Sequence, residues 1–242
     1  MTILFDGRFS QTSDFSLYDR IERAPEAHDV PPITGGVPGV YEIVTDPIGT
    51  ESVAKITARA GSPGRCELRP FFRDTSAAAP EFGERWYAWW DLFPNDFFDE
   101  IPGVAHPETN LLSSTEDIVA QCHSHPDFGD GSHAPQFSLY VQGRRIKFMR
   151  THDTVTPTTE IVPNLTVYGS WPLEKMRWIE WVLHVNWAIN SNGFFHLYKD
   201  RRRVHSQVGA PNTYNDALGP YFKSGFYKYS GTLSPATRVR YA

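Results

Sequence analysis

Cysteine, helical periodicity and long apolar runs are scarce in this sequence. It has two cysteines among 242 residues, Cys66 and Cys122, which excludes a dense disulfide framework. Buried free thiols and a single disulfide between them both stay open. No long stretch has the apolar spacing of a helix, and no run is long enough to span a membrane. Residues 1–7 lack the basic region and apolar segment of a signal peptide. We therefore expect no membrane insertion.

A large excess of positive charge is also missing. The net charge is -5 and the pI is near 6.0, which argues against a general nucleic-acid binder. The basic run 199–203 fits the solvated end of a hairpin, although it could extend a groove for anions. We expect no nucleic-acid partner, while a local acidic ligand stays open.

What the sequence does contain favours strands joined by turns. Aromatic residues make up 14% of the chain, with 19 Pro and 18 Gly. The length suits one domain over residues 1–242, burying about 70% of its unfolded surface. Residues 24–39, 74–83, 95–116, 126–135 and 151–170 read as loops, and we predict an all-β fold. Strands are predicted over residues 3–5, 15–18, 40–44, 52–58, 65–69, 86–93, 118–125, 136–141, 144–149, 177–189, 194–198 and 221–229.

Three of these predicted strands carry one polar face each. In 121–125, Gln121, His123 and His125 alternate with small residues. In 65–69 the charged residues alternate with Cys66 and Leu68, and in 221–229 tyrosines and Lys223 alternate with Phe222 and Phe226. Strands with one chemically equipped face each predict a single sheet surface that carries a site.

The same three stretches carry a family resemblance. Arg-x-Glu-Leu-Arg at 65–69, Gln-x-His at 121–123 and Tyr-Phe-Lys-x-Gly-x-Tyr at 221–227 resemble the motifs of the alginate lyase 7, heparin lyase I and glucuronan lyase-like group of polysaccharide lyases. The resemblance implies a concanavalin A-like β-jelly roll, a sandwich of two curved antiparallel sheets. It also implies a cleft on the concave face that binds an acidic polysaccharide, with no cofactor.

The activity implied by the resemblance is β-elimination on a uronate-containing glycan. Removal of the C5 proton needs a base, departure of the C4 oxygen needs an acid, and the developing enolate needs cations or hydrogen-bond donors. The resemblance makes His123 the base and Tyr227 the acid for one sugar stereochemistry, and for the other Tyr227 performs both transfers. The implied catalytic residues are His123, Tyr227, Arg65 and Gln121, and the implied substrate-binding residues are Arg69, Lys223, Glu67 and Tyr229.

Simpler interpretations and a metal site compete with this hypothesis. The charged residues of 65–69 fit a cross-strand salt-bridge ladder, and the tyrosines of 221–229 could pack a sheet edge. His123 and His125 have strand spacing for one metal ion, and His133 could contribute from the following loop. The Glu that a cupin-type site would place soon after the second histidine is missing, so we expect no metal.

A different class of function is the main alternative. A jelly roll with a basic, aromatic cleft can bind a glycan without cleaving it, because fold alone does not fix activity. A non-catalytic glycan-binding module, such as a phage tail or virion-associated adhesin for a host polysaccharide, fits the same residues. Either function predicts an extracellular or virion-associated protein, with membership of a virion or larger secreted assembly left open.

Overall fold

A computed structural model describes residues 18–23, 40–59, 65–70, 82–97, 117–124, 126–228 and 237–242. Every regular element among these residues is a strand, which confirms the all-β prediction. The predicted strand at 3–5 and residues 15–17 of the predicted strand at 15–18 lie outside the described residues, and Tyr18 is the first residue of β1. The strands are β1 (Tyr18–Arg23), β2 (Val40–Thr45), β3 (Ser52–Ala58), β4 (Arg65–Pro70), β5 (Gly83–Asp91), β6 (Asp117–His123), β7 (Phe137–Gln142), β8 (Arg145–Arg150), β9 (Thr166–Pro172), β10 (Ile179–Trp187), β11 (Phe194–Lys199), β12 (Arg202–Val208), β13 (Tyr221–Lys228) and β14 (Arg238–Tyr241).

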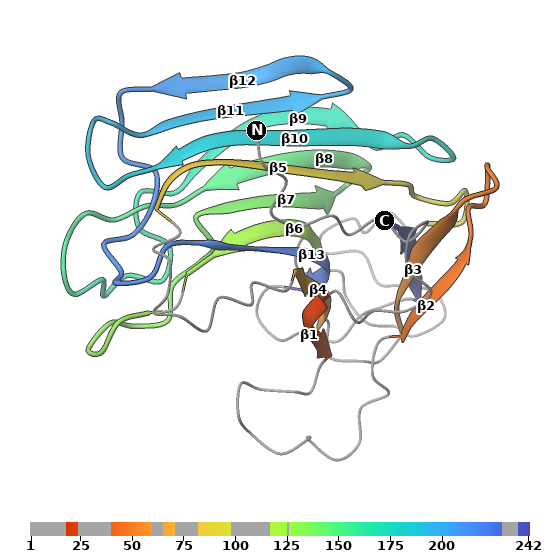
Figure 1. Cartoon of the computed structure of the whole chain (residues 1–242), viewed down its shortest axis with the longest axis horizontal. Coiled ribbons are helices and arrows are strands. Elements are labelled where there is room, and N and C mark those ends of the chain that lie inside the picture. The colour runs from red at the N-terminus through yellow and green to blue at the C-terminus, as the bar shows by residue number, and fades with distance from the viewer. Residues whose placement is uncertain are drawn as a thin grey trace.

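The strands form three antiparallel sheets. The largest has seven strands in the order β1-β4-β13-β6-β7-β8-β9, and the second has four in the order β12-β11-β10-β5. Strands β14, β3 and β2 form a small third sheet. Figure 1 shows the four-stranded sheet lying in front of β7, β8 and β9 of the large sheet, with β2 and β3 set to one side. The three motif strands β4, β13 and β6 are therefore direct neighbours in one sheet.

The core lies between the two larger sheets. Along β10, alternate side chains from Ile179 to Trp187 are at most 1% exposed, as the predicted alternation requires. Trp89 of β5 contacts Phe222 of β13 at 5.0 Å between ring centroids. Phe148 of β8 stacks on Phe195 of β11 at 5.7 Å. Ring contacts between strands of opposite sheets define a sandwich and leave the other face of each sheet for function.

Two hairpins follow from their turn residues. The β7–β8 turn uses Gly143 and Arg144, both at positive φ (57° and 62°), one residue later than predicted. The turn at 190–193 joins β10 to β11 as predicted, where the Asn192 backbone N–H donates to Asn190 Oδ1 at 2.8 Å.

The prediction of a continuous loop over 151–170 is wrong at its end. Strand β9 begins at Thr166 and pairs with β8 at the edge of the large sheet. Its Thr, Gly and Pro residues give a weak strand signal, yet an edge strand tolerates Pro172 as its last residue.

Strands β12 and β14 were also missed. The turn between β11 and β12 is formed by Asp200 and Arg201, both at positive φ, inside the run of charge that hid the strand. Strand β14 contains two buried arginines, with Arg240 bound to Asp91 and Arg238 bound to Asp117. An apolar pattern could not reveal a strand held by buried ion pairs.

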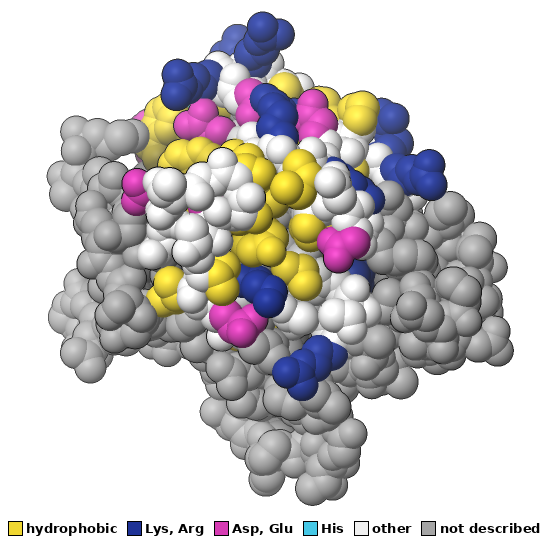
Figure 2. All heavy atoms as spheres, turned by 90° about the vertical axis from the view of Figure 1, so that its right-hand side faces the viewer, with side chains coloured by type: hydrophobic (Ala, Val, Ile, Leu, Met, Phe, Trp, Pro, Cys, Tyr) yellow, Lys and Arg dark blue, Asp and Glu magenta, His cyan; other side chains and the backbone are white. Residues whose placement is uncertain are grey.

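The described surface mixes both signs of charge. Figure 2 shows Lys and Arg side chains beside Asp and Glu, around a central group of hydrophobic ones. Lys55 pairs with Glu42 at 2.9 Å across β2 and β3. No helix in the described part of the chain is long and apolar enough to cross a membrane.

Candidate active site

The candidate site is a row of side chains along β13 in the large sheet. On one flank, Tyr221 lies opposite His123 and Lys223 opposite Gln121 of β6. On the other flank, Tyr227 lies opposite the backbone of Arg65 in β4. The partners on the opposite face, Phe222 and Phe226 among them, belong to the core. From Tyr221 to Tyr227 the row is about 20 Å long at about 3.3 Å per residue, enough for several sugar residues.

The floor of the row is a buried polar group of three residues. Gln121 Nε2 donates a hydrogen bond to Glu67 Oε1, and Lys223 Nζ lies 3.9 Å from Glu67 Oε2. All three residues are at most 1% exposed. Charges this deep are stabilised only when they are paired and hydrogen-bonded, so the three side chains hold one another in place.

Gly225 is what allows the floor to form across three strands. Gly225 pairs with Glu67 of β4, and its strand, β13, lies between β4 and β6. A Cβ atom at Gly225 would lie 2.0 Å from the Cys66 carbonyl oxygen and 2.5 Å from Glu67 Cα. Only glycine permits this backbone approach, which lets the Glu67 side chain pass over β13 to Gln121.

His123 stands at one end of the row and is half-buried. Its Nδ1 lies 2.5 Å from the Ser124 carbonyl oxygen, which can only accept a hydrogen bond. Nδ1 therefore carries the proton of the neutral ring, and Nε2 is the basic nitrogen. The ring packs between Tyr221 (6.2 Å between centroids) and His133 (5.6 Å). The oriented imidazole can act as a general base.

Tyr227 stands toward the other end, also half-buried. The pairing of β6 with β7 shifts between Ile118 and Ala120, so Ile118 leaves the main core and packs with Tyr140, Met149 and Tyr227. Because Tyr227 pairs with Ile118, five residues before His123 in β6, its Cα lies about 17 Å from that of His123 at about 3.3 Å per residue. Both side chains are long, and a sugar ring between them would be reached from both ends.

The remaining predicted residues have mixed outcomes. Only the backbone of Arg65 and Arg69 is described, and Tyr229 and His125 lie outside the described residues. Cys66 and Cys122 are buried in the core and form no disulfide with each other, so of the two interpretations left open the structure supports buried thiols. The structure thus unites Gln121, Lys223, Glu67 and His123, with Tyr227 further along the same face.

A polar network beside His123 was not predicted. Asp216 Oδ2 accepts a hydrogen bond from Ser124 Oγ, and Gln136 Nε2 donates to Ser124 Oγ at 2.6 Å. Asp130, His133 and Asp216 bring their ligand atoms within 4.8 Å of one another. The Asp and His residues of loop 126–135 were a visible signal, but Asp216 lies far along the chain in an irregular segment without a motif.

Comparisons with known proteins show the family to which the chain belongs. A family model described as polysaccharide lyase matches residues 10–241. The chain belongs to the polysaccharide lyase family. Among curated protein sequences, none matches this lyase.

Solved structures of lyases share the fold. An endo-β-1,4-glucuronan lyase from the fungus Trichoderma reesei superposes with a TM-score of 0.62 at 16% identity, covering 93% of this chain and 87% of that one. Alginate lyase A1-II', of polysaccharide lyase family 7, gives 0.53 at 15% identity, covering 82% and 79%. Alginate lyase vAL-1 from Chlorella virus gives 0.53 at 10% identity, covering 84% and 86%. At such low identity these likenesses establish the jelly-roll fold of the lyase.

Proposed function

We propose that this lyase cleaves a uronate-containing acidic polysaccharide by β-elimination along the β13 row. The observation that carries the proposal is that His123, Gln121, Lys223 and Tyr227 lie on one face of two paired strands. This face points away from the core. In a member of the polysaccharide lyase family, such a face offers a base, an acid and hydrogen-bonding groups within the span of a bound glycan.

The proposed reaction needs no oxidant or reductant, because β-elimination only moves a proton and an electron pair within the substrate. Nε2 of His123 removes the C5 proton of a uronate residue, and the electron pair forms the C4–C5 double bond as the C4–O bond breaks. The Tyr227 hydroxyl gives its proton to the departing oxygen. The oriented tautomer of His123 and the partial exposure of both side chains support these roles.

The groups that lie between His123 and Tyr227 would stabilise the developing enolate. Gln121 and Lys223 lie between His123 and Tyr227 in the row, with Glu67 beneath. The Lys223 ammonium and the amide of Gln121 are preorganised donors in a site of low solvent access, where such groups stabilise developing negative charge most strongly. Arg65 of β4 is proposed to join Gln121 in stabilising the enolate, and Arg69 and Tyr229 are proposed to bind the carboxylates and rings of the neighbouring sugars.

The substrate panel follows from the similar structures. The Trichoderma reesei protein is a glucuronan lyase and two others are alginate lyases, so glucuronan and alginate are the first polymers to test. A polymer of this kind is met outside the cell. We place the lyase there, either secreted or carried on a larger assembly such as a virion.

The decisive experiment measures the unsaturated product by its ultraviolet absorbance. Purified lyase is incubated with glucuronan, alginate, heparan-type and hyaluronan-type polymers beside the Tyr227→Phe and Glu42→Gln variants. Glu42 lies on β2 in the small sheet and serves as the matched surface control. We expect an absorbance rise with at least one polymer, lost in Tyr227→Phe and kept in Glu42→Gln.

Two outcomes would contradict the proposal. A rise unaffected by Tyr227→Phe would remove Tyr227 from the reaction. Binding of a polymer without any absorbance rise would identify a non-catalytic glycan-binding module instead.

A further inference from the structure

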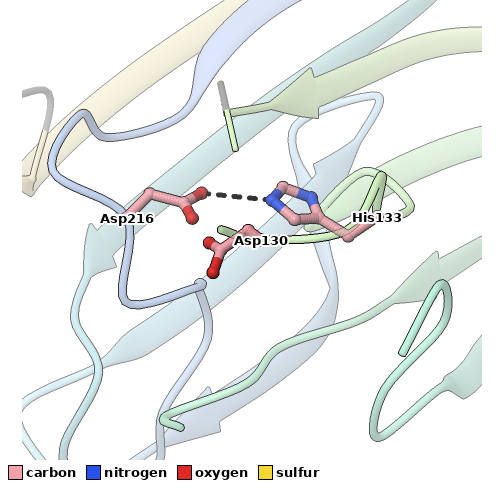
Figure 3. A group of neighbouring side chains, drawn as sticks. All are labelled: Asp130, His133 and Asp216. Atoms are coloured by element: carbon pink, nitrogen blue, oxygen red, sulfur yellow. Dashed lines mark ion pairs between the residues drawn. The ribbon is translucent and has the colours of Figure 1, made fainter. Parts of the chain in front are cut away.

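Three side chains that can act as metal ligands converge at one end of the sandwich, beside His123. Asp130 and His133 come from the loop between β6 and β7, and Asp216 comes from the segment between β12 and β13. One nitrogen or oxygen atom of each lies within 4.8 Å of the others. Figure 3 shows the His133 ring and the Asp216 carboxylate pointing toward each other, with Asp130 beside them.

His133 is aimed into this cluster with no hydrogen bond to satisfy it. The residue is 3% exposed, and neither ring nitrogen has a hydrogen-bond partner in the described part of the chain. Its Nε2 lies 3.4 Å from Asp216 Oδ2. A charge-assisted hydrogen bond would be about 2.7 to 2.9 Å, whereas two ligands of a tetrahedral zinc ion at about 2.0 to 2.1 Å stand about 3.3 Å apart. The separation fits shared coordination better than a direct bond.

The rest of the cluster is prepared for the same task. His133 is held by stacking on Tyr214 at 3.9 Å between centroids. Asp130 accepts backbone N–H groups from Thr158 at 2.9 Å and Asp127 at 3.3 Å. Such hydrogen bonds orient the ligands of a metal from outside, as in known metal sites.

The buried Asp216 carboxylate also indicates a site for a cation. It is 4% exposed, and its Oδ1 has no hydrogen-bond partner among the described residues. Its Oδ2 accepts from Ser124 Oγ. A buried carboxylate oxygen is costly unless it is paired or coordinates a metal.

We propose that Asp130, His133 and Asp216 bind one divalent transition-metal ion of the zinc class. One imidazole and two carboxylates suit zinc, whereas calcium and magnesium prefer oxygen ligands alone. The ion would join the loop after β6 to the segment before β13, next to the His123 ring. This metal site goes beyond the proposed function, because the ion would hold the two segments together and would take no step in the elimination.

The test uses the full chain without any polysaccharide. Protein treated with a chelator and dialysed is titrated with ZnCl2, and bound zinc is measured by elemental analysis together with the unfolding temperature. We expect one zinc per chain and a higher unfolding temperature, with CaCl2 and MgCl2 giving neither. CoCl2 in place of zinc should give the visible absorption of a four- or five-coordinate site.

Variants assign the site. Asp130→Asn and His133→Gln should each weaken zinc binding by more than about tenfold. His196→Gln, on strand β11 in the four-stranded sheet, should bind zinc as the unaltered chain does. Asp130 is half-buried, so its variant is the one expected to keep the fold if His133→Gln does not.

Three results would overturn the proposal. These are no stoichiometric zinc binding by the unaltered chain, binding unchanged in a folded Asp130→Asn variant, or equal stabilisation by calcium. The first two would leave His133 and Asp216 as an ion pair, and the third would show that the bound ion is not of the zinc class. Because the readouts need no substrate, failure here is distinguishable from failure of the proposed lyase activity.

Discussion

Tyr221 lies directly opposite His123 in the pairing of β13 with β6, whereas Tyr227 pairs with Ile118. The Tyr221 ring contacts the His123 ring at 6.2 Å between centroids, and Lys223 Nζ lies over the face of the Tyr221 ring, 5.2 Å from its centroid. Tyr221 is 6% exposed, while Tyr227 is half-buried. The two tyrosines of the row therefore differ: Tyr221 packs against the proposed base, whereas Tyr227 is a group that substrate can reach.

This difference predicts opposite results for the same substitution. Tyr227→Phe should lower kcat by about 10² to 10⁴, the range expected when a proton-transfer group is lost. Tyr221→Phe keeps the ring beside His123 and should lower kcat by less than about tenfold, since it removes no such group. Steady-state kinetics on the best polymer of the panel measures both. The reverse order would make Tyr221 the acid.

The polar face of β6 could be predicted because a strand alternates strictly. Gln121 and His123 fall on one side and Ala120 and Cys122 in the core, as the pattern requires. The shift in pairing near Ile118 could not, because it depends on the neighbouring strand and moves an apolar residue onto the polar side. Tyr227 therefore has an apolar setting that no local pattern indicated.

Contacts between distant segments were beyond sequence reasoning for the same reason. The Gln121–Glu67 hydrogen bond requires the order β4-β13-β6, which depends on tertiary pairing. The position of Asp216 beside His133 depends on an irregular segment ending near the β6–β7 loop. Hydrophobic periodicity reveals which face is buried, but not which polar groups meet on it.

The floor of the row should be a stability element. Glu67→Gln removes the negative charge that faces the Lys223 ammonium, and both residues are 1% exposed. Breaking a buried ion pair typically costs about 3 to 5 kcal/mol, so we expect a loss of about 3 kcal/mol in the free energy of unfolding. Urea unfolding monitored by circular dichroism measures it. In the double variant with Lys223→Met, the loss should be smaller than the sum of the single losses.

A surface pair supplies the control for this measurement. Lys55 and Glu42 are 2.9 Å apart, with side chains 32% and 46% exposed. Glu42→Gln should cost less than about 1 kcal/mol, because solvent screens exposed pairs. Equal effects of the Glu67 and Glu42 substitutions would show that the buried contact contributes no more than a surface one.

Gly225→Ala should damage the sheet itself. The new Cβ would approach backbone atoms of β4, the Cys66 carbonyl oxygen at 2.0 Å and Glu67 Cα at 2.5 Å, which cannot rotate away as a side chain can. Overpacking typically costs about 1 to 3 kcal/mol and occasionally more, and we expect at least about 3 kcal/mol here. Gly131→Ala is the matched control, since its Cβ would be 3.5 Å from the nearest atom. Similar unfolding temperatures for the two variants would contradict the tight crossing at Gly225.

Stability should fall as the pH drops below about 6.5, because three half-buried histidines resist protonation. The pKa of His205 is lowered by burial and then by the nearby charges of Arg150 and His196. Burial also lowers the pKa of His152 and His196. The unfolded chain, with a histidine pKa near 6.5, then binds more protons than the folded one. The free energy of unfolding therefore rises with pH through this range, and the contribution of these histidines is lost on acidification.

The substitution that isolates this effect is His205→Phe. The ring lies 4.5 Å from Tyr168 and 5.0 Å from Phe148 between centroids, so phenylalanine fits the same aromatic contacts without titrating. Urea unfolding at intervals from pH 5 to 8 should give a flatter pH dependence for the variant than for the unaltered chain, with His152 and His196 supplying what remains. An unchanged slope would mean that His205 is protonated equally easily in the folded and unfolded chain, and that burial beside Arg150 does not govern its charge.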